Sequence, residues 1–351
     1  MTSPSLRSTA ALASIVAIAS CAVAKADPIA DFYKGKTVTI VASSSAGGPI
    51  DLACRTVARH ISKHIPGNPT VVVRNMPGGG HVLMTNYMYN QAPKDGTVIG
   101  GVVNSIPTHQ VINGRGVRFD ARKFLWLGST GRSNLMTFAW HTAGFKTIQD
   151  VFERELLTGA TGYGSGTFIY TNAMNVILGT KFKMVMGYKG SPQVTLAVER
   201  GEVQGRGGMT LTGLKQEQPD WVPEKKVIML VQVGEEREPE FSNVPLMHEL
   251  GKTEEQRQVL DLISSPAALG RPFFLPPDVP ADRVAALRKA FAATMKDPAY
   301  IAEGRKVRLD LNPLSAEQIT KLVNATINAP PAIVAKARAA LGTDEKKGKK
   351  K

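Results

Sequence analysis

A glycine-rich segment between a predicted strand and a predicted helix is the first part of the sequence that could do chemistry. The segment SSSAGGP, residues 43–49, follows the apolar run at 37–42. Gly47 and Gly48 leave the backbone amides accessible, and Pro49 suits the first position of a helix. Unpaired amides at a helix N-terminus, together with the positive end of the helix dipole, bind anions. We therefore expect ligand contacts from Ser44, Ser45, Ala46, Gly47 and Gly48.

Asp51 lies in the first turn of this predicted helix. A carboxylate at that position can accept backbone amides and hold the loop, but it would repel an anion that it faced. We assign Asp51 an orienting role in the ligand site. For one such loop, the alternative of a purely structural strand-to-helix turn stays open.

Three further loops repeat this chemistry. They are GATGYGSGTF at 159–168, MPGGGH at 76–81 and GYKGSPQ at 187–193, each placed after a predicted strand. Ligands of open α/β sheets bind at the carboxyl ends of strands, so loops from two lobes facing one cleft would suit a ligand with two negative ends. The side chain of His81 could donate to the ligand, and Tyr163 could form an apolar wall. The further candidates for ligand contact are Gly79, Gly80, His81, Tyr163, Gly164, Ser165, Gly166, Thr167, Gly190 and Ser191.

The sequence lacks the common catalytic and metal-binding patterns. The stretch GYGSG at 162–166 matches neither the G-x-S-x-G nucleophile motif nor G-x-G-x-x-G, and G-x-x-x-x-G-K-[ST] does not occur. His60 and His64 stand four residues apart, but no Glu follows His60 as in H-E-x-x-H, so a solvated helix face is favoured over a metal site. No carboxylate pair stands out for acid–base chemistry. We expect neither an enzyme, nor a metal site, nor a cofactor.

Alternating strands and helices must position these loops. Such alternation predicts an α/β protein with mainly parallel sheets and helices on both faces. A new series begins near residue 129, so we predict a discontinuous first lobe at 27–128 plus 235–341 and a second lobe at 129–234, joined by a two-strand hinge. The predicted strands are 37–42, 70–74, 97–103, 136–140, 156–160, 183–188 and 226–233, and the predicted helices are 50–65, 81–90, 147–155, 168–178 and 192–200.

The C-terminal part is rich in predicted helices, which we expect to pack back on the first lobe. Apolar residues recur at a helical spacing from Val284 to Met295, so one face of that helix is expected to be buried. Ser315 and Gln318 form a capping box that begins the next helix. Pro330 and Pro331 separate it from a last, Ala-rich helix.

The two ends of the chain carry signals of their own. Arg7, the apolar run at 9–24 and the sequence Ala24-Lys25-Ala26 predict a signal peptide over residues 1–26, and hence export to the periplasm. An alternative stays open, because the residues up to Cys21 resemble a lipobox, which would make Cys21 a lipidated first residue. Residues 342–351 predict a disordered, Lys-rich tail.

Composition argues against a nucleic-acid partner. The formal charge of the chain is +14, but seven of the positive residues lie in the signal region and in the terminal EKKGKKK. The mildly basic body that remains suits anionic small ligands. It has no Lys/Arg stripe with interleaved aromatic residues, so we expect no nucleic acid. Cys54 is the single cysteine left after cleavage, and we expect it to be a small buried core residue.

The ordered set of motifs resembles the Bug-type periplasmic binding proteins of tripartite tricarboxylate transporters. The matching pieces are SSAGGPIDLACRTVARHI, NMPGGGH followed by APKDGTVIG, GATGYGSGT, YKGSPQVTLAVERGEV, VPLMHELG and FLPPDVPADRVAALRKAFAATMKDP. The resemblance implies the type II periplasmic binding protein fold, in which two α/β lobes close on a ligand in a central cleft. It also implies that carboxylates bind to the loops at 44–48 and 164–167.

The resemblance further implies a function and partners. We expect a monomeric extracytoplasmic solute-binding protein that delivers a small organic acid to the membrane subunits of such a transporter. The alternative is a ligand-responsive periplasmic adaptor for a sensor kinase. Three departures from the family pattern concern the ligand: Ser43-Ser44 replaces an aromatic-Pro pair, His81 replaces Gly or Ala, and Gln204 stands where Asp is frequent.

Overall fold

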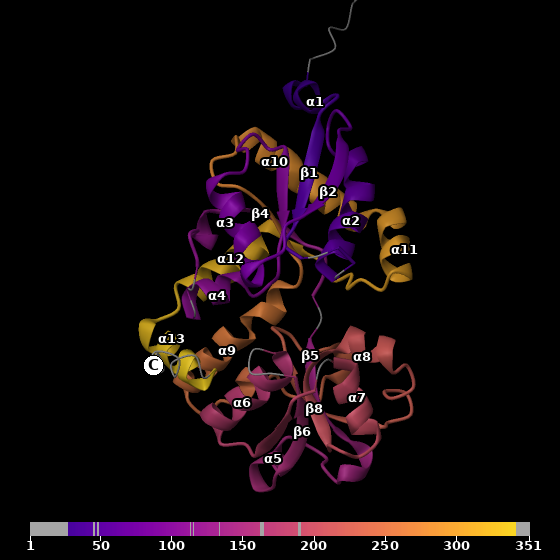
Figure 1. Cartoon of the computed structure of the whole chain (residues 1–351), viewed down its shortest axis with the longest axis vertical. Coiled ribbons are helices and arrows are strands. Elements are labelled where there is room, and N and C mark those ends of the chain that lie inside the picture. The colour runs from indigo at the N-terminus through magenta and orange to yellow at the C-terminus, as the bar shows by residue number, and fades with distance from the viewer. Residues whose placement is uncertain are drawn as a thin grey trace, which may run out of the picture.

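Two β-sheets, each covered by helices, form two lobes that lie one above the other along the long axis of the molecule (Figure 1). The structure is a computed structural model and describes residues 27–341 apart from 45, 48, 113, 115, 133, 162–164, 189 and 190. The predicted signal peptide, with Cys21, and the predicted tail at 342–351 lie outside the described residues. The predicted fold class of two α/β lobes is confirmed.

The first sheet has the strand order β11-β4-β10-β3-β1-β2. Strands β1, β2 and β3 pair in parallel, so their carboxyl ends lie at one edge of the sheet, whereas β10 pairs antiparallel with β3 and β4. Because β10 comes from far along the chain, the first lobe is discontinuous in sequence. The strands are β1 Thr37–Ala42, β2 Thr70–Asn75, β3 Val98–Gly101, β4 Leu125–Ser129, β10 Pro272–Leu275 and β11 Leu314–Ser315.

The second sheet has the strand order β7-β6-β8-β5-β9. Strand β6 pairs in parallel with β7 and β8, and β5 pairs antiparallel with β8 and β9. The carboxyl ends of β6, β7 and β8 therefore share one edge of this sheet. The strands are β5 Leu135–Trp140, β6 Leu156–Ala160, β7 Phe182–Met186, β8 Gly205–Thr210 and β9 Val227–Val233.

Helices cover both faces of the first sheet. On one face, Val57 and Ile61 of α2 share a core with Leu287 and Phe291 of α10. On the other face, α3 and α12 pack in a second core, and α12 begins with the predicted capping box, which is confirmed. The helices of this lobe are α1 Pro28–Tyr33, α2 Pro49–Ile61, α3 Val82–Asn90, α4 Ile106–Ile112, α10 Ala281–Lys296, α11 Pro298–Lys306 and α12 Ala316–Ile327.

Two C-terminal helices, α9 and α13, pack on the second lobe and also contact helices of the first. Ile263 of α9 and Val334 of α13 belong to the same core as Met174 of α6. The expectation that all of residues 235–341 return to the first lobe is therefore incomplete, because α9 and α13 contact α4 of that lobe and share a core with α6 of the other. The helices of this lobe are α5 Gln149–Glu153, α6 Gly166–Leu178, α7 Ser191–Glu199, α8 Leu211–Glu217, α9 Glu254–Leu269 and α13 Pro331–Ala340.

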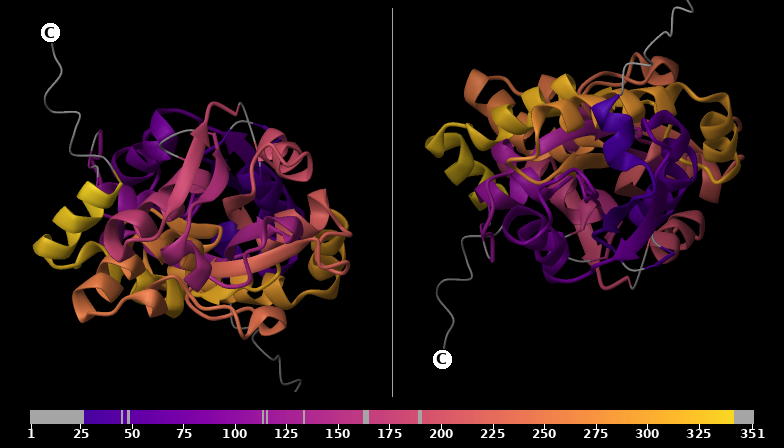
Figure 2. Two further views of the ribbon diagram at one scale, coloured as in Figure 1. Left: turned by 90° about the horizontal axis from the view of Figure 1, so that it is seen from below. Right: turned by 90° about the horizontal axis from the view of Figure 1, so that it is seen from above.

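The end-on views show how the C-terminal part joins the lobes. In both views of Figure 2 its orange and yellow helices gather along one side of the molecule. The chain passes between the lobes after β4, again between α9 and β10, and a third time between α12 and α13. Cys54 is fully buried in the first lobe, as predicted. Within the described ranges, no helix is long and apolar enough to cross a membrane.

Candidate functional site

The loop after β1 is held by the carboxylate of Asp51, which lies in the first turn of α2 and is 2% exposed. Its Oδ2 atom accepts the backbone N–H of Gly47 at 2.8 Å and the Nε–H of Arg55 at 2.9 Å. Its Oδ1 atom accepts the side-chain amide of Asn75, at the end of β2, at 2.8 Å. The contacts are those of the orienting role that the sequence predicts for Asp51.

The pKa of Asp51 lies below its ordinary value. Burial acts to raise this pKa, but the hydrogen bonds from Arg55, Gly47 and Asn75 together outweigh burial and lower it. Asp51 is therefore ionised at neutral pH, and its oxygens accept hydrogen bonds from its own loop, from α2 and from the end of β2. Asn75 also donates to the carbonyl of Ser44 at 2.9 Å, which ties the loop after β1 to the end of β2.

His81 ties a second loop to the same place. It stands at the N-cap of α3 with φ of +76°, and its Nδ1 atom lies 2.9 Å from Ser43 Oγ and 3.0 Å from Ser43 O. The short helix η2, Gly79–His81, is thus fixed to the carboxyl end of β1. The sequence predicts that His81 donates to a ligand; Nδ1 instead serves the contact between the loops, which leaves Nε2 for that role.

The loop after β6 in the second lobe is held by hydroxyl groups. Thr167 Oγ1 accepts the backbone N–H of Thr161 at 3.1 Å and lies 2.6 Å from Ser165 Oγ. Helix α6 begins at Gly166, two residues earlier than predicted, and the Ser165 side chain does not cap it. Helix α7 begins at Ser191, one residue earlier than predicted. The predicted ligand contacts Ser45, Gly48, Tyr163, Gly164 and Gly190 lie outside the described residues.

A cavity of about 160 Å³ lies between the lobes. The first lobe contributes Ile50, next to Asp51, and the second lobe contributes Leu135 and Thr210, the N-cap residue of α8. Among the described residues, none of the predicted contacts lines this cavity; Ile50, in the first turn of α2, is the lining residue next to the loop after β1. The residues lining the cavity are Ile50, Val102, Val103, Asn104, Gly131, Leu135, Thr210, Ala267, Gly270, Arg271 and Asp310.

Several of these residues were not singled out from the sequence. Val102 and Val103 end the predicted strand at 97–103 and Asn104 follows it, so the rule that ligands bind at the carboxyl ends of strands could have found this segment. Arg271 and Asp310 carry no local signal, because only the tertiary fold brings them to the cleft. Two larger grooves, of about 710 and 500 Å³, contain none of the predicted contact residues.

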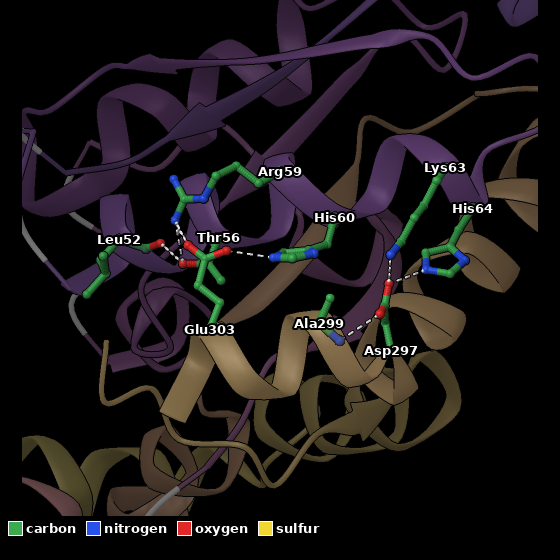
Figure 3. Close-up of polar contacts among 9 residues, drawn as sticks. All are labelled: Leu52, Thr56, Arg59, His60, Lys63, His64, Asp297, Ala299 and Glu303. Carbon is green, nitrogen blue, oxygen red and sulfur yellow. Dashed lines mark hydrogen bonds and ion pairs between the residues drawn. The ribbon is translucent and has the colours of Figure 1, made fainter. Parts of the chain in front are cut away.

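The prediction that His60 and His64 lie on a solvated helix face is wrong, because both side chains contact carboxylates of α11 (Figure 3). His60 Nε2 lies 2.6 Å from Glu303 Oε2 of α11, and His64 Nε2 lies 3.0 Å from Oδ2 of Asp297, the N-cap residue of α11. The two histidines thus fasten α2 and the short helix η1, Ser62–His64, to α11. In the part of the chain that the structure describes, no group of side chains is suited to hold a metal ion.

Solved structures with the same fold include solute-binding proteins. A TctC solute binding protein from Polaromonas, without ligand, has a TM-score of 0.69 and 16% identity, covering 89% of this chain and 99% of that one. The R. palustris protein Rpa4515 with adipate has a TM-score of 0.57 and 20% identity, covering 88% and 97%. The periplasmic binding protein BugD has a TM-score of 0.58 and 19% identity, covering 88% and 98%. At these identities the likeness shows the fold.

The sequence itself also has relatives. It is 25% identical over 344 residues to the UPF0065 protein in the gbd 5′ region of Cupriavidus necator, which covers 93% of this chain and 95% of that relative. The sequence model of the tripartite tricarboxylate transporter family receptor matches residues 53–338. The resemblance seen in the motifs is thereby confirmed, and the chain belongs to the tripartite tricarboxylate transporter receptor family.

Proposed function

We propose that this chain is an extracytoplasmic solute-binding protein that captures a small carboxylate between its lobes and delivers it to a tripartite tricarboxylate-type transporter. One observation carries the proposal. Both lobes line a cavity that the first turn of α2 borders through Ile50, and strand-to-helix loops lead into α2 in the first lobe and into α6 in the second. Membership of the receptor family supports it, and so does the adipate bound to the structurally similar Rpa4515.

The proposed mechanism uses backbone amides in place of charged side chains. The amides at the starts of α2 and α6 donate to the carboxylate, aided by the helix dipoles. Hydrogen bonds to a charged group are worth about 1.5–3 kcal/mol each, so a handful exceeds the ~8 kcal/mol of micromolar affinity before ordering costs. A ligand that contacts both lobes favours the closed arrangement, because it binds that arrangement better.

The setting of the proposed function follows from the ends of the chain and from the family. The predicted signal peptide at 1–26 supports export to the periplasm, and a lipid anchor at Cys21 is the alternative form of attachment. The proposed partners are the organic acid and the membrane subunits of the transporter, met by a monomer. We also propose that the protein binds the organic acid without converting it chemically.

Thermal unfolding with a panel of mono-, di- and tricarboxylates, aromatic acids and neutral sugars tests the proposal. A ligand at 100 times its dissociation constant adds about 2.7 kcal/mol to the free energy of unfolding, which raises the melting temperature measurably. A shift with one class of acids is expected. A shift with neutral or cationic compounds and with no acid would show that the glycine-rich loops are structural turns.

A further inference from the structure

An arginine lies in the wall of the cavity between the lobes. Among the described residues that line this cavity, Arg271 and Asp310 are the two that carry a charge. Neither belongs to the glycine-rich loops. The cavity thus holds a charged pair, and Ile50, in the first turn of α2 beside the proposed carboxylate loop, lines the same cavity.

The backbone of Arg271 is fixed at the edge of the sheet where the ligand loops lie. Its N–H donates to Ser129 Oγ at 2.8 Å, and its carbonyl accepts the N–H of Thr130 at 3.2 Å. The next residue, Pro272, begins β10, and its carbonyl accepts the N–H of Val102 just after β3. Because β10 runs antiparallel to β3, Arg271 lies beside the carboxyl ends of the parallel strands.

The side chain of Arg271 is held at one end and open at the other. Its Nη1 atom forms an ion pair with Oδ2 of Asp310. The Asp310 side chain is 7% exposed, whereas the Arg271 side chain is 24% exposed. A guanidinium has five N–H donors in a planar fork, so one bond to Asp310 leaves donors for a ligand. Since a buried charge without a partner is costly, the ion pair also stabilises the nearly buried carboxylate of Asp310.

Two glycines allow the three chain segments around this pair to meet. A Cβ atom at Gly131 would overlap the carbonyl oxygen of Asp310. A Cβ atom at Gly270, which has φ of +63°, would overlap the carbonyl oxygen of Gly131. The ion pair of Arg271 and Asp310 therefore lies where closely packed backbone segments cross between the lobes, and this packing fixes the backbone positions of both residues.

We propose that Arg271 binds a second carboxylate of the ligand and makes the cleft selective for dicarboxylates over monocarboxylates. The inference rests on the proposed function, in which backbone amides hold the first carboxylate. A planar guanidinium matches a carboxylate with two parallel hydrogen bonds. Amides at helix N-termini would hold one carboxylate of either acid, so the preference between the two classes depends on Arg271. Asp310 acts as a positioning residue for Arg271.

Isothermal titration of the unliganded full chain with matched acids tests the proposal. The pairs are succinate and butyrate, adipate and hexanoate, and terephthalate and benzoate, each of which differs by one carboxylate. In at least one pair, the dicarboxylate is expected to bind about 10- to 100-fold more tightly, the range of one charge-assisted contact. Equal affinity within every pair that binds would overturn the inference and leave the proposed function standing. Binding of no acid would remove both.

Variants then assign the preference to its residue. Arg271→Gln is expected to weaken the dicarboxylate by about 10- to 100-fold and to leave the monocarboxylate unchanged. Arg257→Gln is the matched control, because Arg257 is exposed on α9, pairs with the carboxylate of Glu254 and lines neither this cavity nor the two larger grooves. The double variant Arg271→Gln/Asp310→Asn avoids an unpaired buried carboxylate if the single variant unfolds. A dicarboxylate preference that survives in the double variant would overturn the role of Arg271.

Discussion

The two glycine-rich loops of this protein are fixed in different ways. The first-lobe loop is held by side chains from distant parts of the sequence, namely Asn75 of β2 and His81 at the start of α3, together with Asp51. In the second-lobe loop, the hydroxyl hydrogen bonds described above join residues at most six positions apart. The side-chain hydrogen bonds described for the first loop thus reach distant parts of the sequence, whereas those described for the second are local.

This difference indicates that the two loops differ in how rigid they are before a ligand binds. A loop held by the Asp51–Arg55 ion pair, by the side-chain amide of Asn75 and by His81 is preorganised before a ligand arrives, which reduces the ordering cost of binding. A loop held by short-range hydroxyl contacts can adjust at little cost. We therefore expect the first lobe to bind first and the second lobe to complete the site on closure. The predictions below test this division, from the largest expected effect to the smallest.

Replacing the central carboxylate of the first loop should have the largest effect. Asp51→Ala leaves Arg55, Asn75 and the N–H of Gly47 without their acceptor, which should lower the free energy of unfolding by about 3 kcal/mol. Ligand affinity should also fall strongly, because the loop loses its shape. Urea unfolding and calorimetric titration measure the two effects. The control is Asp31→Ala, an exposed first-turn carboxylate of α1, and a similar loss there would remove the special role of Asp51.

Gly47→Pro should abolish binding and leave both lobes folded. Gly47 has φ of +82° and donates its N–H to Asp51, and proline permits neither. The strain should cost about 1–3 kcal/mol of stability. Circular dichroism and titration follow fold and affinity. Gly201→Pro is the matched control, because Gly201 has φ of +73° and its N–H also donates, but it follows α7, away from the cleft. Unchanged affinity in Gly47→Pro would refute the first-loop assignment.

The second loop should respond less to loss of its central hydroxyl. Thr167→Val keeps the shape of the side chain but removes the acceptor of the Thr161 N–H, which should cost about 1–2 kcal/mol of stability. Affinity is expected to drop by less than in Asp51→Ala. Thr320→Val, which removes a hydroxyl bond within α12, serves as control. A loss of affinity larger than that of Asp51→Ala would reverse the proposed order of the two loops.

Lowering the pH should destabilise the first loop more than the second. The pKa of Asp51 is lowered in the folded protein, so its stabilising effect is complete above its ordinary pKa and is lost as the pH falls through the lowered value. The hydroxyl groups of the second loop do not titrate in this range. Hydrogen exchange between pH 5 and 2.5 should therefore show faster relative opening at 46–51 than at 165–168. Equal loosening of the two loops would contradict the comparison.

The contacts between α11 and α2 should also lose stability on acidification. Side-chain hydrogen bonds from Lys63 and His64 lower the pKa of Asp297, and those from Arg59 and His60 lower the pKa of Glu303 against the opposing effect of burial. These groups therefore contribute stability above the ordinary pKa of a carboxyl group, and it is lost on acidification. Asp297→Asn should reduce the slope of stability against pH below pH 5, and an unchanged slope would exclude this contribution.

Local signals in the sequence predict much of the fold and part of the candidate site. The glycine, proline and serine patterns mark the loops after β1 and β6, and alternation of apolar runs marks most strands. Strand β8 was missed because its sequence GRGGMT resembles a turn. Its glycines serve a long-range contact, since a Cβ atom at Gly208 would overlap the carbonyl oxygen of Gly166 at the start of α6.

The parts of the site that the sequence does not predict are brought together by the tertiary fold. Asn75 ends an ordinary strand, and Arg271 and Asp310 lie 39 positions apart with no periodic pattern to link them. The partners of His60 and His64 are more than 230 positions away, so a spacing of four residues alone suggests a solvated face. The contacts that fix the cleft join residues far apart in the sequence, and no spacing pattern links such residues.

The position of β10 in the first sheet sets the order in which the lobes can be completed during synthesis. β4 has only β10 and β11 as neighbours, and both come from the C-terminal part of the chain. All strands of the second sheet lie between residues 135 and 233, so that sheet can close while the first still has unpaired edges. A chain that ended before residue 272 could have one complete sheet and one incomplete sheet, and the unpaired edges of β3 and β4 would be open to pairing with other chains.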